Sequence, residues 1–360
     1  MVRSGSASGT TAGPTLAVVA REAGVSVPTA SKVVNGRADV APETRRRVTE
    51  ALERLGYVRR PRFDAAKAPA LVDLVVQALD SPWSGAVLRG VEEAAREAGL
   101  EVVVSSAPPG HGTGLTHSSG GSGSGGRPDR GWLDRLTARG SAGVLFHVAE
   151  LSPAQYARLD HLRLPYVMID PVSEPPAGVV SVGAANWRGG VTATEHLLEL
   201  GHERIAVVAG SRRRMCGAAR VAGYRSALAS AGVRPRAEYL RVGGPDEGAA
   251  RVRMLELLDL PEPPTAVFAC SDRAALGVYG ALAERGLRVP YDMSVVGFGD
   301  LPEARWAAPA LTTVRRPTAE MASTALRLLV RMMAGDRPEG TRTELSTRLV
   351  ERASTAPPPV

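Results

Sequence analysis

LAVVAREAGVSVPTASKVV, residues 16–34, decides the fold at the N-terminal end of the chain. Apolar residues recur at helical spacing from Leu16 to Ala23 and again from Val27 to Val34. Gly24 lies between the two runs, and glycine readily adopts the positive φ that a tight turn between helices requires. The stretch therefore predicts a helix-turn-helix.

Small and capping residues stand where this arrangement needs them. Ala20 allows the two helices to approach, while Val25 and Ala30 fill the space between them. Ser26 precedes the second helix as an N-cap, and Pro28 lies in its first turn, where a missing N–H costs no hydrogen bond. A generic three-helix bundle is the alternative interpretation.

A third helix and a concentration of positive charge complete this module. We expect the helix from Pro42 to Leu55, where Val48, Ala51 and Leu52 follow helical spacing. Residues 1–67 hold twelve lysines and arginines against six acidic residues, whereas the rest of the chain is nearly neutral, with 32 against 31. A basic face can be merely solvated, but on a helix-turn-helix it favours DNA as the partner.

The composition divides the chain into four parts. We expect a disordered tail at 1–14, a helix-turn-helix DNA-binding domain at 15–58, a basic hinge linker at 59–69 and a core at 70–356. Within the core, the Gly/Ser-rich residues 108–131 predict a disordered loop. Its glycines imitate a nucleotide-binding motif, but no strand and helix flank them.

The core alternates short apolar runs with amphipathic helical segments, which predicts an α/β fold with parallel sheets. Strands are expected at 71–76, 101–104, 143–146, 166–169, 204–209, 265–269 and 293–298, and helices at 86–98, 191–200, 221–231 and 274–285. The series suffices for two doubly wound sheets. We assign one to an N-terminal subdomain of about 70–183 and 312–341, and the other to a C-terminal subdomain of about 184–311 and 342–356.

Residues 15–57, TLAVVAREAGVSVPTASKVVNGRADVAPETRRRVTEALERLGY, resemble the DNA-binding headpiece of the lactose-repressor and galactose-repressor family of bacterial transcription regulators. Residues 71–355 are similar to the periplasmic-binding-protein-like core of that family. The resemblance implies a homodimer whose second helices enter the major groove of a near-palindromic operator. It also implies a repressor of carbohydrate-utilisation genes that a sugar or sugar-derived effector controls from a site between the subdomains.

The resemblance also carries DNA contacts over by position. The base-facing residues are Val27, Pro28 and Lys32. The residues expected to contact phosphates or position the helix are Thr15, Ser26, Thr29, Ser31 and Asn35, and the contacts continue through Tyr57, Arg59, Arg60 and Arg62. Val27 and Pro28 have no side-chain donors, so they are expected to contact thymine methyl groups, and Lys32 carries most of the polar specificity.

The linker departs from the pattern of the family. Ala66 stands where a leucine usually wedges into the minor groove. Phe63 is one substitute wedge. We favour the other interpretation, a basic linker whose arginines contact phosphates.

Residue types that bind polyols follow the predicted strands, and ligands of open parallel sheets bind beyond the strand C-termini. Trp83 is suited to stack on a sugar, Asp170 to accept from hydroxyls and Arg220 to donate to them. Taken singly, they are equally well explained as a core residue, a helix cap and a surface ion pair. The family places effector contacts at these positions, and Ser271 matches another one.

Two positions of this predicted pocket depart from the family. Gly299 replaces a usual aspartate, and Arg316 replaces a usual glutamine. The loss of an acid and the gain of a base point to an effector with an acidic group, or to a ligand bound lower in the cleft. Asp300 is retained and is a candidate substitute for the missing aspartate, although its strand parity points it elsewhere.

The sequence lacks the signatures of other classes of protein. The six histidines are scattered and form no catalytic or metal motif, and Cys216 and Cys270 are expected to be reduced thiols, so we predict neither an enzyme nor a cofactor or metal. No apolar stretch predicts a signal peptide or a membrane span, which favours the cytoplasm. A transport-type sugar receptor is the alternative function, but it has no use for the basic headpiece.

Overall fold

The computed structural model describes residues 16–34, 37, 39–55, 69–106, 130–211, 214–243, 246–336 and 338–359. The chain divides into two compact units, residues 1–68 and residues 69–360. The tail predicted at 1–14, linker residues 59–68 and loop residues 108–129 lie outside the described residues. Residues 130 and 131 of the predicted loop are helical, so the loop prediction is wrong at its C-terminal end.

The first unit is the predicted three-helix module, with α1 (Leu16–Glu22), α2 (Val27–Val34) and α3 (Pro42–Arg54). Gly24 has a φ of +62° in the turn, and the Val25 N–H donates to the Ala20 carbonyl at 2.9 Å. Apolar side chains from all three helices are buried together, among them Val19, Ala20, Ala30, Val33, Val48 and Ala51. The helix-turn-helix prediction is confirmed.

Arg47 fastens α3 to the end of α1, a contact that the sequence pattern did not predict. Its Nη2 donates to the carbonyls of Ala23 at 2.6 Å and Gly24 at 3.1 Å, and its Nε donates to Ala23 at 3.2 Å. These carbonyls lie at the C-terminal end of α1, where helix carbonyls lack intrahelical partners and a positive charge is favourable. One of the basic residues of α3 therefore stabilises the fold.

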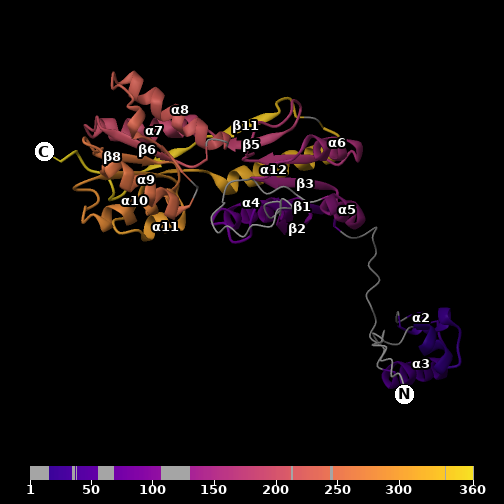
Figure 1. The fold of residues 1–360 in the computed structure, drawn as a ribbon. Helices are drawn as coiled ribbons and strands as arrows, with labels where there is room; N and C mark the ends of the chain where they lie inside the picture. The colour runs from indigo at the N-terminus through magenta and orange to yellow at the C-terminus, as the bar shows by residue number, and fades with distance from the viewer. Residues whose placement is uncertain are drawn as a thin grey trace, which may run out of the picture. The chain divides into compact units, whose positions relative to one another are not determined.

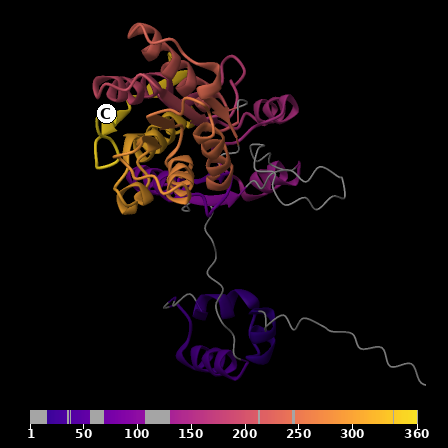
Figure 2. The ribbon, with the colours of Figure 1, turned by 60° about the vertical axis from the view of Figure 1, so that its left-hand side comes forward.

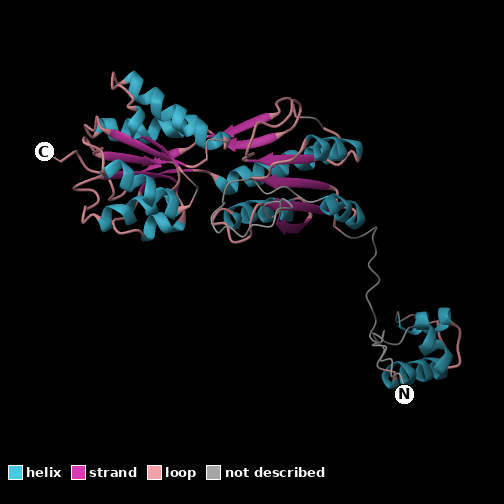
Figure 3. Ribbon diagram, in the orientation of Figure 1, coloured by secondary structure: helices cyan, strands magenta, loops and turns pink. Residues whose placement is uncertain are grey.

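The first sheet of the core is entirely parallel, in the order β11-β5-β4-β3-β1-β2 (Figures 1 and 3). Its strands are β1 (Leu71–Val76), β2 (Glu101–Ser106), β3 (Gly143–His147), β4 (Tyr166–Ile169), β5 (Ser181–Ala184) and β11 (Arg342–Leu345). Helices α4 (Ser84–Glu97) and α12 (Thr318–Met333) bury one face, and α5 (Arg130–Arg139) and α6 (Pro153–His161) the other. Successive side chains of each strand thus meet two different helix layers.

The second sheet has the order β12-β10-β9-β8-β6-β7 and is parallel except for β12 at its edge. Its strands are β6 (Ile205–Ala209), β7 (Leu240–Val242), β8 (Ala266–Ala269), β9 (Ser294–Gly299), β10 (Thr312–Arg315) and β12 (Arg348–Val350). Helices α7 (Asn186–Glu199) and α8 (Met215–Ser230) cover one face, and α9 (Glu247–Leu258) and α10 (Asp272–Glu284) the other (Figure 2). The short helices η1 (Ala237–Tyr239) and α11 (Pro302–Trp306) complete this half.

Two C-terminal segments belong to the opposite sheet from the one predicted. Residues 312–315, assigned to the N-terminal subdomain, form β10 beside β9 in the second sheet. Residues 342–345, assigned to the C-terminal subdomain, form β11 beside β5 in the first. Each strand has only four residues and mixes polar with apolar side chains, so tertiary pairing rather than an apolar run decides its place.

The residues after β12 run along the second sheet, where two histidines hold them. His202 forms hydrogen bonds with the Thr265 hydroxyl at 2.9 Å and the Ala356 carbonyl at 2.8 Å, and His196 Nε2 lies 3.0 Å from the Thr355 hydroxyl. Both rings are buried and have these structural partners. Among the helices that the structure describes, none combines the length and apolarity needed to cross a membrane.

Candidate functional site

Helix α2 presents the predicted base-facing residues on an open surface. Val27 is 45% exposed, which is unusual for a valine, and Pro28 and Lys32 are also exposed. Ser26 caps the helix, because its hydroxyl accepts from the Thr29 N–H at 3.3 Å and lies 2.8 Å from the Thr29 hydroxyl. Exposed apolar residues at the start of a helix-turn-helix recognition helix suit contact with thymine methyl groups.

Lys32 forms an exposed ion pair on the same surface. Its Nζ lies 2.8 Å from Asp39 Oδ2, and the hydrogen bond from Lys32 is the main reason why the pKa of Asp39 is lowered. Both side chains are more than half exposed, and such a pair is worth little in water. Lys32 can therefore exchange partners readily. Ser31 is half-buried on α2, and the other predicted contacts lie outside the described residues: Thr15, Asn35, Tyr57, Arg59, Arg60 and Arg62, together with Phe63 and Ala66 of the linker.

A cavity of about 440 Å³ lies in the core where strands of both sheets end, and we call it the strand-end cavity. Its walls are formed by residues that follow β1, β3 and β4 of the first sheet and β6, β8 and β10 of the second, together with the start of α8. All five predicted effector contacts line it, and they are Trp83, Asp170, Arg220, Ser271 and Arg316. The structure thus brings together residues that are spread over more than 230 positions of the chain.

Asp170 and Arg316 form a buried ion pair in this cavity. Arg316 Nη1 donates to Asp170 Oδ2 at 2.9 Å, and the two side chains are 7% exposed or less. Burial opposes ionisation of Asp170, but the charges of Arg316 and Arg220 outweigh it, so the pKa of Asp170 is lowered. The guanidinium of Arg316 also lies over the Trp83 ring, with Cζ 4.7 Å from its centroid.

Arg220 is buried and has neutral hydrogen-bond partners. Its Nε and Nη2 donate to Asn186 Oδ1 at 2.9 and 2.7 Å, and its Nη1 donates to the Cys270 carbonyl at 2.6 Å. The guanidinium stacks on Phe298, 3.7 Å from the ring centroid. The alternative of a surface ion pair is therefore wrong. The sequence did not predict Asn186, because its partner lies 34 residues away.

Ser271 caps a helix beside the cavity. Its hydroxyl accepts from the Ala274 N–H at 3.1 Å and so caps α10. Asp300, next to Gly299, is not among the residues that line the cavity, and it forms ion pairs with Arg315 and Arg352. It therefore does not replace the aspartate expected at position 299.

His147 lines the strand-end cavity, although sequence reasoning set it aside as one of the scattered histidines. It is the last residue of β3 and only 2% exposed, and its Nε2 has no hydrogen-bond partner within the described part of the chain. Its pKa is lowered to about 4, chiefly by burial; the charge of Asp170 opposes this shift, and the charges of Arg316 and Arg214 add to it. The rule that strand ends hold ligand contacts would have found it, because GVLFH ends on this residue.

Burial of neutral His147 makes stability depend on pH. As the pH is lowered, the unfolded state takes up a proton at an ordinary pKa near 6.5, whereas the folded state does so only near 4. The free energy of unfolding is therefore expected to fall as the pH falls from about 6.5 to about 4. In His147→Gln this loss, up to about 3 kcal/mol, should be absent. Burial raises the pKa of Asp272 to about 6, so protonation of this carboxyl favours the folded state as the pH falls. This opposite effect is the same in the wild type and in the variant. The measurement is therefore the difference between their denaturant curves, and a pH-independent difference contradicts the assignment.

Gly299 leaves the space that Trp83 occupies. It has a φ of +140°, and a Cβ added there would lie 2.2 Å from Cη2 of Trp83. Trp83 follows β1 of the first sheet and Gly299 ends β9 of the second, so the contact joins the two halves of the core. The absence of an aspartate at position 299 thus has a steric reason: the indole takes the place of its side chain.

Gly299→Ala is expected to lower the free energy of unfolding by about 1–3 kcal/mol, because the methyl group overlaps the Trp83 ring and the backbone disfavours a side chain. Gly183→Ala is the matched control, since a Cβ there meets nothing within 4 Å. In a Trp83→Ala background the cost of Gly299→Ala should shrink. Equal chemical stability of Gly299→Ala and the wild type would refute the overlap.

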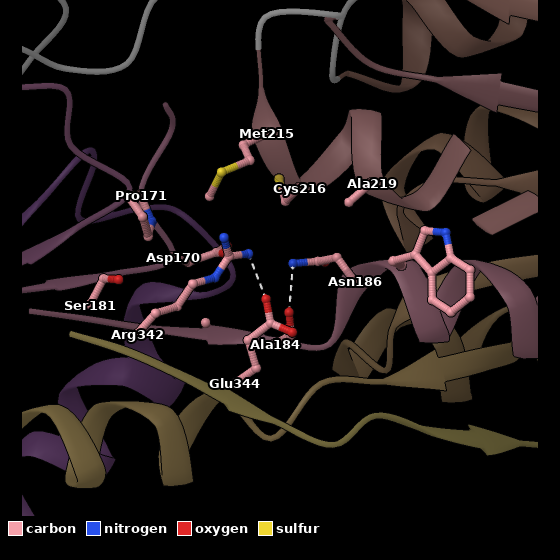
Figure 4. Close-up of a pocket in the computed structure, with 12 residues that line it drawn as sticks. Asp170, Pro171, Ser181, Ala184, Asn186, Met215, Cys216, Ala219, Arg342 and Glu344 are labelled. Atoms are coloured by element: carbon pink, nitrogen blue, oxygen red, sulfur yellow. Dashed lines mark hydrogen bonds and ion pairs between the residues drawn. The ribbon is translucent and has the colours of Figure 1, made fainter. Parts of the chain in front are cut away.

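A second, smaller cavity of about 90 Å³ adjoins Asp170 and Cys216, which also line the strand-end cavity. Arg342 and Glu344 of β11 are paired at one side of it (Figure 4). The side-chain amide of Asn186 donates to the Ala184 carbonyl at 3.0 Å. This smaller cavity has room for a few waters rather than a sugar. No group of three or more potential metal ligands gathers in the described ranges.

Comparisons with known proteins identify families that match both parts of the chain. Residues 15–60 match the family described as bacterial regulatory proteins, lacI family, and residues 194–355 match a periplasmic binding protein-like domain. The HTH-type transcriptional regulator CelR of Thermobifida fusca is 35% identical over 351 residues, which cover 95% of this chain and 98% of that protein.

Solved structures show the same likeness. A complex of the transcriptional regulator CelR with cellobiose has a TM-score of 0.67 at 34% identity, covering 95% of this chain and 99% of that one. A lac repressor dimer bound to its operator and the anti-inducer ONPF has a TM-score of 0.70 at 25% identity, covering 96% and 100%.

Proposed function

The chain belongs to the lacI family of bacterial regulatory proteins, and on this premise we propose that it is a repressor of carbohydrate-utilisation genes controlled by a sugar or sugar-derived effector. It is a DNA-binding transcriptional regulator and not an enzyme. One observation carries the effector proposal: Trp83, Asp170, Arg220, Ser271 and Arg316 meet in one cavity of a size that suits a small ligand. The CelR structure with cellobiose supports a sugar as the ligand class.

The regulator is proposed to act as a homodimer in the cytoplasm. The related lac repressor binds its operator as a dimer, and a near-palindromic site presents the same bases to two symmetry-related recognition helices. The cytoplasm follows from the DNA partner. A transport-type receptor would share the fold of the core, but the exposed face of α2 would serve no purpose there.

We propose that the segments connecting the two sheets transmit the effect of effector binding. The chain passes between the sheets three times, after β5, after β10 and after β11. Two of these passages hold cavity residues or their partners: Asn186, which binds Arg220, and Arg316, which binds Asp170. A ligand that favours one angle between the halves would shift the population of DNA-binding and released states.

A thermal-shift panel tests the effector proposal. A ligand that binds only the folded state raises the unfolding temperature, so one class among mono- and oligosaccharides, uronates, sugar phosphates and purines should do so. The same ligand should change the affinity for operator DNA in an anisotropy assay. A purine as the sole active compound would refute the sugar proposal.

Lys32→Ala is expected to weaken operator binding by about 1–3 kcal/mol and to affect nonspecific DNA much less, because Lys32 is assigned to a base edge. Arg46→Ala is the control. Arg46 is an exposed arginine of α3, and if it meets only phosphates, its loss should weaken both kinds of DNA equally. Competition binding at several salt concentrations separates the two effects. An equal loss on both DNAs in Lys32→Ala would reassign Lys32 to the phosphates.

A further inference from the structure

Arg316 lines the strand-end cavity with two of its three guanidinium nitrogens unpartnered. Nη1 donates to Asp170, but Nε and Nη2 are buried and meet no hydrogen-bond acceptor among the residues that the structure describes. Nε and Nη2 form one edge of the planar group, and such an edge matches the two oxygens of a carboxylate. A buried donor without an acceptor costs free energy, so its presence in a cavity wall points to a ligand.

The charge of the same wall points to an acidic ligand. Arg220 and Arg316 are both buried, but Asp170 is the one buried carboxylate that lines the cavity with them in the described part of the chain. The hydrogen bonds of Arg220 go to the neutral oxygens of Asn186 and Cys270. His147 adds no negative charge. One positive charge therefore lacks a counter-charge, and burying it is costly unless a ligand supplies one.

The rim of the cavity does not correct this imbalance. Asp80 and Asp246 line it on the acidic side, and Arg214 and Arg273 line it on the basic side, so the rim charges cancel. Gly299 contributes no carboxylate at the end of β9, beside the Trp83 ring that lies against Arg316. The excess charge thus stays with the buried wall.

We propose that the effector is a sugar acid whose carboxylate binds the Nε–Nη2 edge of Arg316, while its sugar part contacts Asp170, Arg220 and the Trp83 ring. This inference rests on the proposed function and names the class of its ligand. A carboxylate fits better than a phosphate, because its two oxygens match two nitrogens and its single charge matches the single excess charge of the wall.

Matched pairs of ligands test the proposal by isothermal titration calorimetry on the full chain. The pairs are glucose and glucuronate, galactose and galacturonate, and cellobiose and cellobionate, with glucose 6-phosphate and galactose 6-phosphate as phosphate probes. At least one acid should bind ten times more tightly than its neutral partner. Arg316→Gln should weaken the binding of that acid about ten- to hundredfold without weakening the neutral sugar.

Two further variants sharpen this measurement. Arg316→Lys keeps the charge but loses the two-donor edge, so it should bind the acid with intermediate affinity. Arg327→Gln removes an exposed arginine of α12 and should behave as the wild type. Tighter binding of neutral sugars overturns the acid proposal and leaves the sugar proposal intact. Binding of the phosphates alone overturns the carboxylate, and no binding at all overturns both proposals.

A ligand-free readout separates this role from a structural one. If Arg316 served only to neutralise Asp170, then Arg316→Gln would break a needed ion pair and lower the unfolding temperature by about 10 °C or more. If the wall carries an excess positive charge for a ligand, Asp170 still faces Arg220 in the variant, and the unfolding temperature should stay unchanged or rise. A large fall therefore overturns the proposal before any ligand is added.

Discussion

A chain that begins at Pro69 is expected to lose operator binding by at least about a thousandfold and to keep its effector cavity. The helix-turn-helix, its recognition helix and most of the excess positive charge lie before this residue. The core that remains is nearly neutral, so neither base contacts nor attraction to phosphates would hold it on DNA. Fluorescence anisotropy with labelled operator measures the loss.

The control for this deletion is a chain that lacks only residues 1–14, which precede the module and should be dispensable for binding. Thermal unfolding of the shortened core, with and without effector, shows whether the cavity is intact. If the core alone shifted DNA as well as the full chain does, the assignment of DNA binding to residues 15–58 would be untenable.

Arg220→Ala is expected to abolish the response to effector, with at least about a hundredfold loss of effector affinity, while operator binding persists. The guanidinium is the most extensively bonded cation of the cavity wall, with donors to Asn186 and Cys270 and a face on Phe298. Its removal takes a charged donor from the ligand and leaves two buried oxygens without a partner. Operator release by effector is the readout.

Arg225→Ala is the matched control, because Arg225 lies on the same helix and is exposed. Arg220→Lys keeps the charge but not the forked contact with Asn186, and it should respond weakly. Asp170→Ala should also lose the response, at a larger cost in stability, because it leaves two buried guanidinium groups without a carboxylate. A normal response of Arg220→Ala, with operator binding intact, would show that the cavity is not the effector site.

Much of this arrangement was predictable because the signals are local or follow from topology. Helical spacing, a turn glycine and a capping serine mark the helix-turn-helix within 19 residues. All seven predicted strands exist, because each contains an apolar run; six of them are buried, and β2 at the sheet edge is half-buried. The rule that parallel strands end at one edge predicted that Trp83, Asp170 and Arg220 lie together, and the family resemblance added Ser271 and Arg316; all five line one cavity.

Other features depend on neighbours that the chain supplies only after folding. β5, β7, β10, β11 and β12 have three or four residues each, and their place in a sheet follows from pairing rather than from their own pattern. His147 looked like one histidine among six until β3 placed it in the cavity wall. Arg47 counted as part of a DNA-binding charge until its contacts with α1 became visible.

The sequence by itself determined the type of each part of this protein: a basic helix-turn-helix, an α/β core of two sheets and polar residues at the strand ends. Tertiary structure alone decided how those residues are paired, because Arg316 meets Asp170 across 146 positions and Trp83 fills a space that a glycine leaves more than 200 residues away. Periodicity and turn residues act over a few neighbours, whereas compensation of a buried charge depends on every group that the fold brings to it.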